Sequence, residues 1–192
     1  RFCQKASNDP EREYFFLIDE INRGNLSKIF GELMMLIESD HRGEKITLAY
    51  NGMPFYVPEN LYIIGMMNTA DRSLALIDYA LRRRFSFFEI EPAFTSDGFL
   101  HYQAALDNET FNALVDQIKK LNLEIKNDPV LGPGFRIGHS YFCLDDPAAC
   151  TTDWMRSVVE FDILPTLAEY WSDAPDKLHH WEENLRGVFN DD

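Results

Sequence analysis

A short apolar run that ends in two acidic residues most constrains the fold of this chain. Tyr14–Ile18 reads YFFLI, which is too short for a buried helix and suits a strand covered on both faces. Asp19 and Glu20 follow directly, at the carboxyl end of that strand, where open α/β sheets bind ligands. The pair predicts either a nucleotide site, with one carboxylate on Mg²⁺-bound water and the other on the attacking water, or two solvated acids.

A second apolar run supplies a neighbour for the first. Residues 61–67 read LYIIGMM and are followed by Asn68. If the two strands are adjacent, the Asn68 amide can hold the same attacking water from its other side. The sequence therefore predicts that one edge of a sheet carries an acidic pair and a polar amide.

Three consecutive arginines, residues 82–84, follow at the expected end of a helix. The helix macrodipole favours cations at this position, which gives them a structural explanation. Successive helical residues point about 100° apart, so the three side chains cannot share one role. One can reach a phosphate on a neighbouring subunit while another pairs with a carboxylate of its own chain.

These segments resemble the McrB family, the AAA+ GTPase subunits of methylcytosine-specific restriction systems. The resemblance is carried by FFLIDEINRGNLSKIFGELMMLIE, YVPENLYIIGMMNTADRSLALIDYALRRRFSFFEIEP and GFRIGHSYF, of which MNTADRS is a distinctive family signature. It implies an α/β fold, namely a partial AAA+ P-loop NTPase three-layer sandwich with a parallel sheet. A small all-α lid domain is expected to follow.

The resemblance also implies roles for individual residues. Asp19 and Glu20 match the Walker B pair, with Asp19 holding Mg²⁺ through water, and Asn68 matches sensor 1. Arg83 and Arg84 match the arginines of the subunit interface, where an arginine finger is expected. Which of the two reaches the neighbouring phosphate stays open at this point.

Further positions match the family around this site. Asp71 and Arg72 complete the signature and are expected to take part in nucleotide binding, and Asn22 and Arg23 match family positions near the site. Arg136, in the GFRIGHSYF segment, is either a sensor 2 residue that approaches the phosphates or a member of a surface ion pair.

A phosphate-binding G-x-x-x-x-G-K-[ST] loop is absent from the 192 residues. The simplest expectation is that the chain is the C-terminal part of a longer protein. In the AAA+ family, the P-loop strand lies between the sensor 1 strand and the strand after the arginines, here expected at residues 85–90. Without it, backbone groups on both sides lack partners. We therefore expect these residues alone to hydrolyse little or no nucleotide.

The sequence divides near residue 93. Residues 1–93 are expected to form the C-terminal part of the AAA+ core, including one helix at 25–38 with its apolar residues on one face. A hairpin is predicted at 46–58, with Asn-Gly at its turn. It resembles the hairpin that projects toward the pore or the substrate in MoxR-like AAA+ proteins, and a plain surface hairpin is the alternative.

Residues 94–192 are expected to form the helical lid. Apolar residues recur at helical spacing over 111–122 and again over 154–170, where Pro165 is expected to kink or split the helix. The glycine-rich segment at 132–142 lies between these helices, and the resemblance places it on the nucleotide side of the lid. His139 in that segment is either a ligand contact or a packed histidine.

The net charge of −14 is concentrated in the second half, which carries −11 against −3 for residues 1–93. An acidic half repels the DNA backbone, so it is a poor candidate for a DNA reader. In the family, that task belongs to a separate N-terminal domain. Contact with DNA is therefore expected only through domains absent from this chain.

Cysteines, histidines and hydropathy indicate a cytoplasmic chain without its own metal centre. Cys3, Cys143 and Cys150 are odd in number and widely spaced, which is typical of reduced thiols. His139–Cys143 and the adjacent His179 and His180 lack a second half at zinc spacing, so the expected metal is Mg²⁺ brought in with nucleotide. Neither a membrane span nor a signal peptide is recognisable.

Three functional interpretations follow. The first is a GTPase motor in a homo-oligomeric ring, expected to be a hexamer, that drives DNA translocation and cleavage with a McrC-type endonuclease subunit. The second is a MoxR-like AAA+ ATPase that remodels proteins. The NTADRS motif argues against this second interpretation. The third is a catalytically silent truncated AAA+ fragment, which the missing loop allows. GTP and ATP both stay open as the nucleotide.

Overall fold

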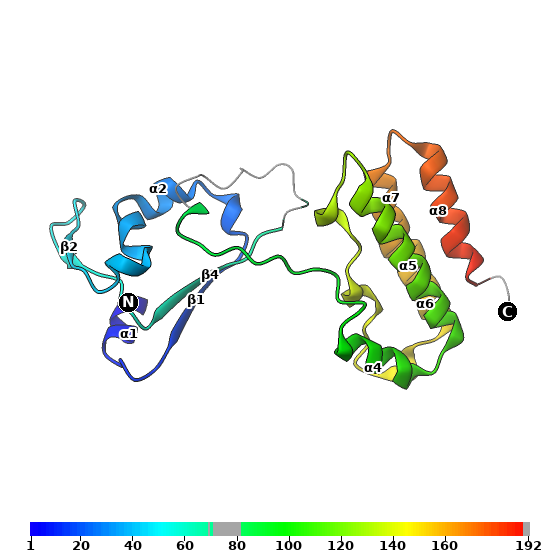
Figure 1. Ribbon diagram of the computed structural model, residues 1–192, viewed down its shortest axis with the longest axis horizontal. Helices are drawn as coiled ribbons and strands as arrows, with labels where there is room; N and C mark the ends of the chain where they lie inside the picture. The colour runs from blue at the N-terminus through cyan, green and yellow to red at the C-terminus, as the bar shows by residue number, and fades with distance from the viewer. Residues whose placement is uncertain (69, 71–81, 190–192) are drawn as a thin grey trace. The chain divides into compact units, whose positions relative to one another are not determined.

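The computed structural model describes residues 1–68, 70 and 82–189. It contains two compact units, Arg1–Phe88 and Glu89–Asp192. Within the described residues, the first unit carries the strands and the second is helical (Figure 1). The division falls a few residues ahead of the boundary expected at residue 93. None of the described helices is both long enough and apolar enough to cross a bilayer.

The described part of the first unit consists of short helices and short strands. Its described elements in chain order, with η for 3₁₀ helices, are α1 (Phe2–Ser7), β1 (Tyr14–Ile18), η1 (Ile21–Arg23), α2 (Leu26–Phe30), η2 (Gly31–Ile37), η3 (Ser39–His41), β2 (Ile46–Thr47), β3 (Pro54–Phe55) and β4 (Leu61–Gly65).

The central feature of this unit is the parallel pair β1–β4. Its register runs from Tyr14 opposite Leu61 to Ile18 opposite Gly65. The pairing continues one step beyond the strands, because the Met66 amide donates to the Ile18 carbonyl at 2.8 Å. This confirms the expected adjacency of the two apolar runs, and both strands end at the same edge.

The expectation that β1 is covered on both faces is wrong for this structure. Phe15 and Leu17 share a face with Tyr62 and Ile64 of β4, and all four are exposed, Leu17 by 60%. Neither apolar cluster among the described residues of this unit includes them. The unit therefore presents an apolar sheet face that its own described residues leave open.

The single helix expected at residues 25–38 is also wrong. Asn25 caps α2 by accepting the Lys28 amide at 2.9 Å, but α2 ends at Phe30. Gly31 follows with φ +48°, which takes the backbone out of the helical region, and a 3₁₀ helix continues to Ile37. The change of direction buries Leu36 and leaves Ile29 exposed, contrary to the predicted apolar face.

The predicted hairpin is confirmed, with strands of only two residues each. β2 and β3 pair antiparallel, with Ile46 opposite Phe55, and Gly52 in the turn has φ +68°. Both carboxylate oxygens of Glu32 accept the Ala49 amide, at 2.9 and 3.1 Å. This contact fixes the hairpin to the segment after α2.

The strand expected at residues 85–90 is not formed. Residues 86–93 have no helix or strand, and Phe88 and Ile90 are exposed. A strand needs a neighbour for its backbone groups, and no described segment pairs with these residues.

The described residues of the second unit, 89–189, form helices and no strand, as expected. Its elements are α4 (Asp97–Leu106), α5 (Glu109–Asn127), η4 (Pro133–Phe135), η5 (His139–Phe142), η6 (Pro147–Ala149), α6 (Thr152–Val158), the π-helical turn η7 (Val159–Ile163), α7 (Leu164–Tyr170) and α8 (Pro175–Gly187). The helix expected over 154–170 changes to a π-helical turn at Val159–Ile163 and resumes as α7 at Leu164, so its regular pattern is interrupted just ahead of Pro165 without a break in the helical structure.

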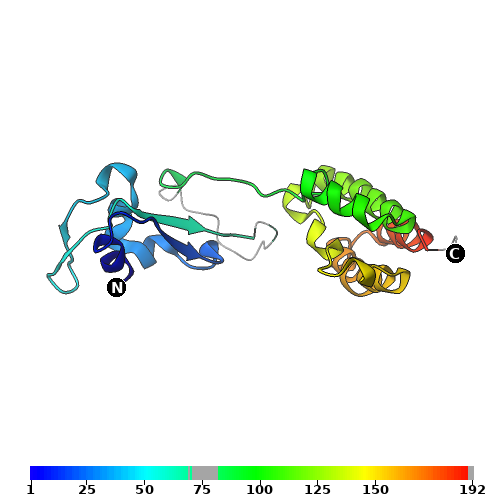
Figure 2. The same cartoon turned by 90° about the horizontal axis from the view of Figure 1, so that it is seen from below.

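Helix α5 organises the core of this unit. Side chains at helical spacing along it are fully buried, namely Phe111, Leu114, Ile118, Leu121 and Ile125. Helix α8 contacts both α5 and α7 (Figure 1, Figure 2). The described cysteines are all free thiols, in line with the expectation of reduced residues.

Helix α5 offers a matched pair of leucines for testing this core. We expect Leu121→Ala to destabilise the lid by about 2–5 kcal/mol, because Leu121 is fully buried and its truncation leaves a cavity. Leu123 lies on the same helix but is 62% exposed, so Leu123→Ala should change stability by no more than about 0.5 kcal/mol. Urea denaturation measures both, and similar losses for the two variants would contradict the packing described.

Asp128 joins the end of α5 to α7 and α8. Its carboxylate accepts the Lys177 ammonium at 2.7 Å, the Trp171 indole N–H at 3.2 Å and the Val130 amide at 2.8 Å. Its side chain is only 7% exposed. The hydrogen bond from Lys177 is the largest cause that holds the pKa of Asp128 well below its ordinary range. The charged form is thus favoured in the folded lid.

The lowered pKa of Asp128 predicts an acid-sensitive lid. The contribution of this carboxylate to stability is present above the ordinary Asp pKa and is lost as pH falls below about 4. We expect Asp128→Asn to cost about 1.5–3 kcal/mol at neutral pH, since hydrogen bonds to a charged group are lost. It should also flatten the acid limb of a stability–pH curve. Asp116→Asn, at an exposed position of α5, is the control and should leave the curve unchanged.

Candidate nucleotide site

The segment after β1 turns sharply at the acidic pair. The Glu20 amide donates to Asp19 Oδ1 at 3.0 Å, and Glu20 adopts the left-handed conformation with φ 49°. The turn brings the Ile21 amide to the carbonyl of Met66, the residue just after β4, at 2.9 Å. Non-glycine residues in this conformation are strained and cluster at functional sites. Both carboxylates are exposed at the strand edge.

Glu20 is held by an ion pair with the next turn. Arg23 Nη1 lies 2.7 Å from Glu20 Oε2, and both side chains are solvent-exposed. Exposed pairs of this kind contribute at most about 1 kcal/mol. The carboxylate can therefore exchange Arg23 for another partner at little cost.

Asn22 lies between these two residues and is buried. Its Oδ1 atom has no hydrogen-bond partner among the described residues. A buried acceptor left without a donor costs about 1–3 kcal/mol. The family resemblance placed Asn22 near the site, and the structure adds that its amide oxygen lacks a donor there.

Asn68 leaves the same sheet edge from β4. Its Oδ1 accepts the Ala70 amide at 3.0 Å, and the residue is exposed. The parallel register thus places Asn68 and the Asp19–Glu20 pair on loops that leave one edge. Asp71 and Arg72, expected to bind nucleotide, lie outside the described residues.

The structure separates the arginines that the sequence left equivalent. Arg84 donates from Nε to the Met34 carbonyl at 3.0 Å and pairs with Glu38 at 2.5 Å, so it is held within its own unit. Arg83 is exposed and forms no hydrogen bond or ion pair with a described residue. The helix predicted to precede them falls largely outside the described residues.

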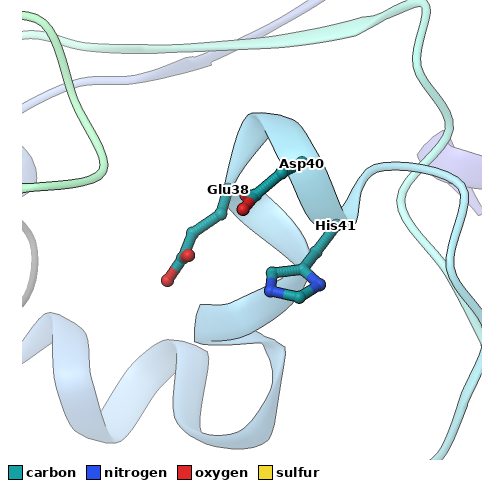
Figure 3. Close-up of side chains that lie close together, drawn as sticks. All are labelled: Glu38, Asp40 and His41. Carbon is teal, nitrogen blue, oxygen red and sulfur yellow. The ribbon is translucent and has the colours of Figure 1, made fainter.

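Glu38 also belongs to a cluster of metal-ligand types with Asp40 and His41 (Figure 3). One ligand atom from each lies within 4.8 Å of the others. Glu38 already pairs with Arg84, and His41 Nδ1 lies 2.8 Å from Glu44 Oε2, a hydrogen bond that raises the pKa of His41. Two of the three members are therefore already engaged with other side chains, and Mg²⁺ at Asp19 stays a prediction.

In the second unit, Arg136 contacts carboxylates. Nη1 lies 3.2 Å from Glu91 and Nη2 lies 3.2 Å from Glu89. His139 is packed, because its ring meets Phe94 edge-on and Nδ1 accepts the Ala93 amide at 3.1 Å. The structure therefore contains ion pairs of the kind expected if Arg136 is a surface ion-pair residue. The sensor 2 role of Arg136 stays a prediction.

Comparison with known families identifies both units. Residues 4–85 match the AAA domain of the dynein-related subfamily. Residues 113–179 match the McrB alpha-helical lid domain. The chain is therefore an AAA-type protein, with an acidic pair at the edge of a parallel sheet in its AAA domain segment and a helical lid after it.

Two curated relatives narrow this class. The chain is 51% identical, over 97% of its length and 43% of the relative, to the Type IV methyl-directed restriction enzyme EcoKMcrB subunit of Escherichia coli K12. It is 28% identical, over 68% of its length and 44% of the relative, to the Type II restriction enzyme BsuMI component YdiS of Bacillus subtilis. The chain belongs to the McrB family of AAA proteins. It spans less than half the length of these relatives.

Proposed function

We propose that the full-length protein is the nucleotide-hydrolysing motor subunit of a modification-dependent DNA restriction complex. The observation that carries the proposal is the β1–β4 register, which brings Asp19, Glu20 and Asn68 to one edge of a parallel sheet. The 51% identity to a subunit of a methyl-directed restriction enzyme supports the biological setting. GTP is the proposed substrate, with ATP as the alternative.

Each residue at this edge of the sheet has a separate proposed role in hydrolysis. Asp19 offers exposed carboxylate oxygens, which suit a hard cation such as Mg²⁺, and would hold it through water. Mg²⁺ bound there with the nucleotide would neutralise charge on the phosphates. Once its side chain is released from Arg23, Glu20 accepts a proton from the attacking water. Asn68 orients that water. Asp71 and Arg72 complete the proposed nucleotide contacts.

The arginine run links the site to a second copy of the protein. Arg84 is held by Glu38 and the Met34 carbonyl, so it fixes the segment that carries its neighbour. Arg83, exposed beside it, is the proposed finger that reaches the phosphates bound by an adjacent subunit. This assignment requires a homo-oligomeric ring, for which we propose a hexamer that works with a McrC-type endonuclease subunit.

The test is nucleotide turnover by the purified full-length protein in the presence of Mg²⁺. We expect GTP hydrolysis, inhibition by excess unlabelled GTP, and a weaker effect of ATP. Competition in which ATP displaces GTP would favour the MoxR-like alternative. Absence of turnover with either nucleotide, with and without an endonuclease partner, would contradict the proposal. The 192 residues alone should remain inactive in the same assay.

A further inference from the structure

Glu89–Phe94, at the start of the second unit, has no helix or strand of its own. It is nevertheless fastened to the lid at both ends. Arg136 lies within ion-pair distance of Glu89 and Glu91. Further along, Ala93 donates its amide to the ring of His139. These side-chain contacts, together with the bond from the Ser96 amide to the Ala93 carbonyl, hold the segment to the lid.

Arg136 is preorganised for this contact. The loop that carries it is fixed to α5 by Asn122, which accepts the Ile137 amide at 2.6 Å and donates to the Ile137 carbonyl at 2.9 Å. Arg136 Nε donates to the Pro133 carbonyl at 2.8 Å. Its side chain is only 11% exposed. Each of the three guanidinium nitrogens thus has an acceptor in the same unit.

The far end of the segment is held by packing. Phe94 is buried and contacts the rings of Phe99, Phe142 and His139. The Ala93 amide donates to His139 Nδ1 at 3.1 Å beside this packing. The Ala93–His139 hydrogen bond and the packing of the Phe94 ring therefore lie next to each other at this end of the segment.

We propose that Arg136 is a positioning residue of the lid. With His139 and Phe94 it forms a clasp that makes Glu89–Phe94 move with the lid. All three guanidinium nitrogens already donate within this unit, to Pro133, Glu89 and Glu91, so we assign Arg136 to holding this segment rather than to direct nucleotide contact. Its effect on hydrolysis rests on the proposed function, because the clasp acts there through the position of the lid.

The Ala93 amide reports on the clasp directly. Hydrogen exchange of this amide, measured by NMR or mass spectrometry on the full-length protein, should accelerate about 5- to 30-fold in Arg136→Gln. Glu91→Gln, at an exposed position that does not threaten folding, should produce a smaller acceleration. Arg186→Gln removes a comparable arginine–carboxylate pair with Glu160 elsewhere in the lid and should leave this amide unchanged.

Charge exchange separates a clasp from a phosphate contact. Arg136→Glu alone should accelerate Ala93 exchange most, because three carboxylates then face each other. Adding Glu91→Arg should recover part of the protection and part of the nucleotide turnover. Unchanged exchange in Arg136→Gln, or no recovery in the double variant, would overturn the clasp. If the wild-type protein shows no turnover, the proposed function fails while the exchange result still decides the clasp.

Discussion

Replacing Arg83 by alanine is expected to lower nucleotide turnover of the assembled protein by about 10³-fold or more, the range observed for arginine fingers. Arg83 is exposed and forms no ion pair with a described residue, whereas Arg84 is held by Glu38 and Met34. The loss should appear in kcat, because the finger stabilises charge in the transition state. Steady-state turnover with saturating nucleotide measures it.

Mixing variants tests whether Arg83 acts on the neighbouring subunit. Arg83→Ala subunits keep Glu20, and Glu20→Gln subunits keep Arg83. A mixed ring therefore contains interfaces with both groups intact, and mixing two inactive preparations should restore turnover. Recovery would not occur if Arg83 served its own site. Arg82→Ala, at the exposed preceding position, is the matched control and should retain activity close to wild type.

Glu20→Gln is expected to lower turnover by about 10²- to 10⁴-fold, since proton transfer by a positioned side chain contributes that much. The amide keeps the size of the side chain but cannot accept the proton of the attacking water. Nucleotide binding should persist, because the proposed contacts of Glu20 are with water rather than with phosphate. Single-turnover hydrolysis and equilibrium binding of a fluorescent nucleotide separate the two effects.

Glu13→Gln provides the control for that experiment. Glu13 precedes β1, is exposed and accepts only a long contact from the Tyr62 hydroxyl, at 3.4 Å. It has the same chemistry as Glu20 at the opposite end of the strand. Turnover in Glu20→Gln within a few-fold of that in Glu13→Gln would remove Glu20 from the proposed mechanism.

Much of the fold could be predicted because local patterns and tertiary packing agree. The apolar runs around β1 and β4 are adjacent, and the period of α5 matches its buried face. Helices α4 and α8 were not predicted from periodicity. Their beginnings carry recognisable signals, since Ser96 caps α4 and Pro175 opens α8.

The break inside residues 25–38 could not be predicted from periodicity. Its apolar spacing fits one helix, but Gly31 takes a positive φ and the chain changes direction. Glycine permits this conformation without requiring it. Which face of the segment becomes buried depends on packing against the rest of the unit, and Leu36 rather than Ile29 enters the core.

The sequence by itself determined the acidic pair at the end of an apolar run, the amide after a second run and the family that both indicate. Those features are local, so residue order is sufficient to define them. Only the tertiary structure decided that Arg84 pairs with a carboxylate of its own unit while Arg83 is exposed. It also decided that Arg136 pairs with Glu89 and Glu91. These pairings join residues more than forty positions apart, and only folding determines which charges meet.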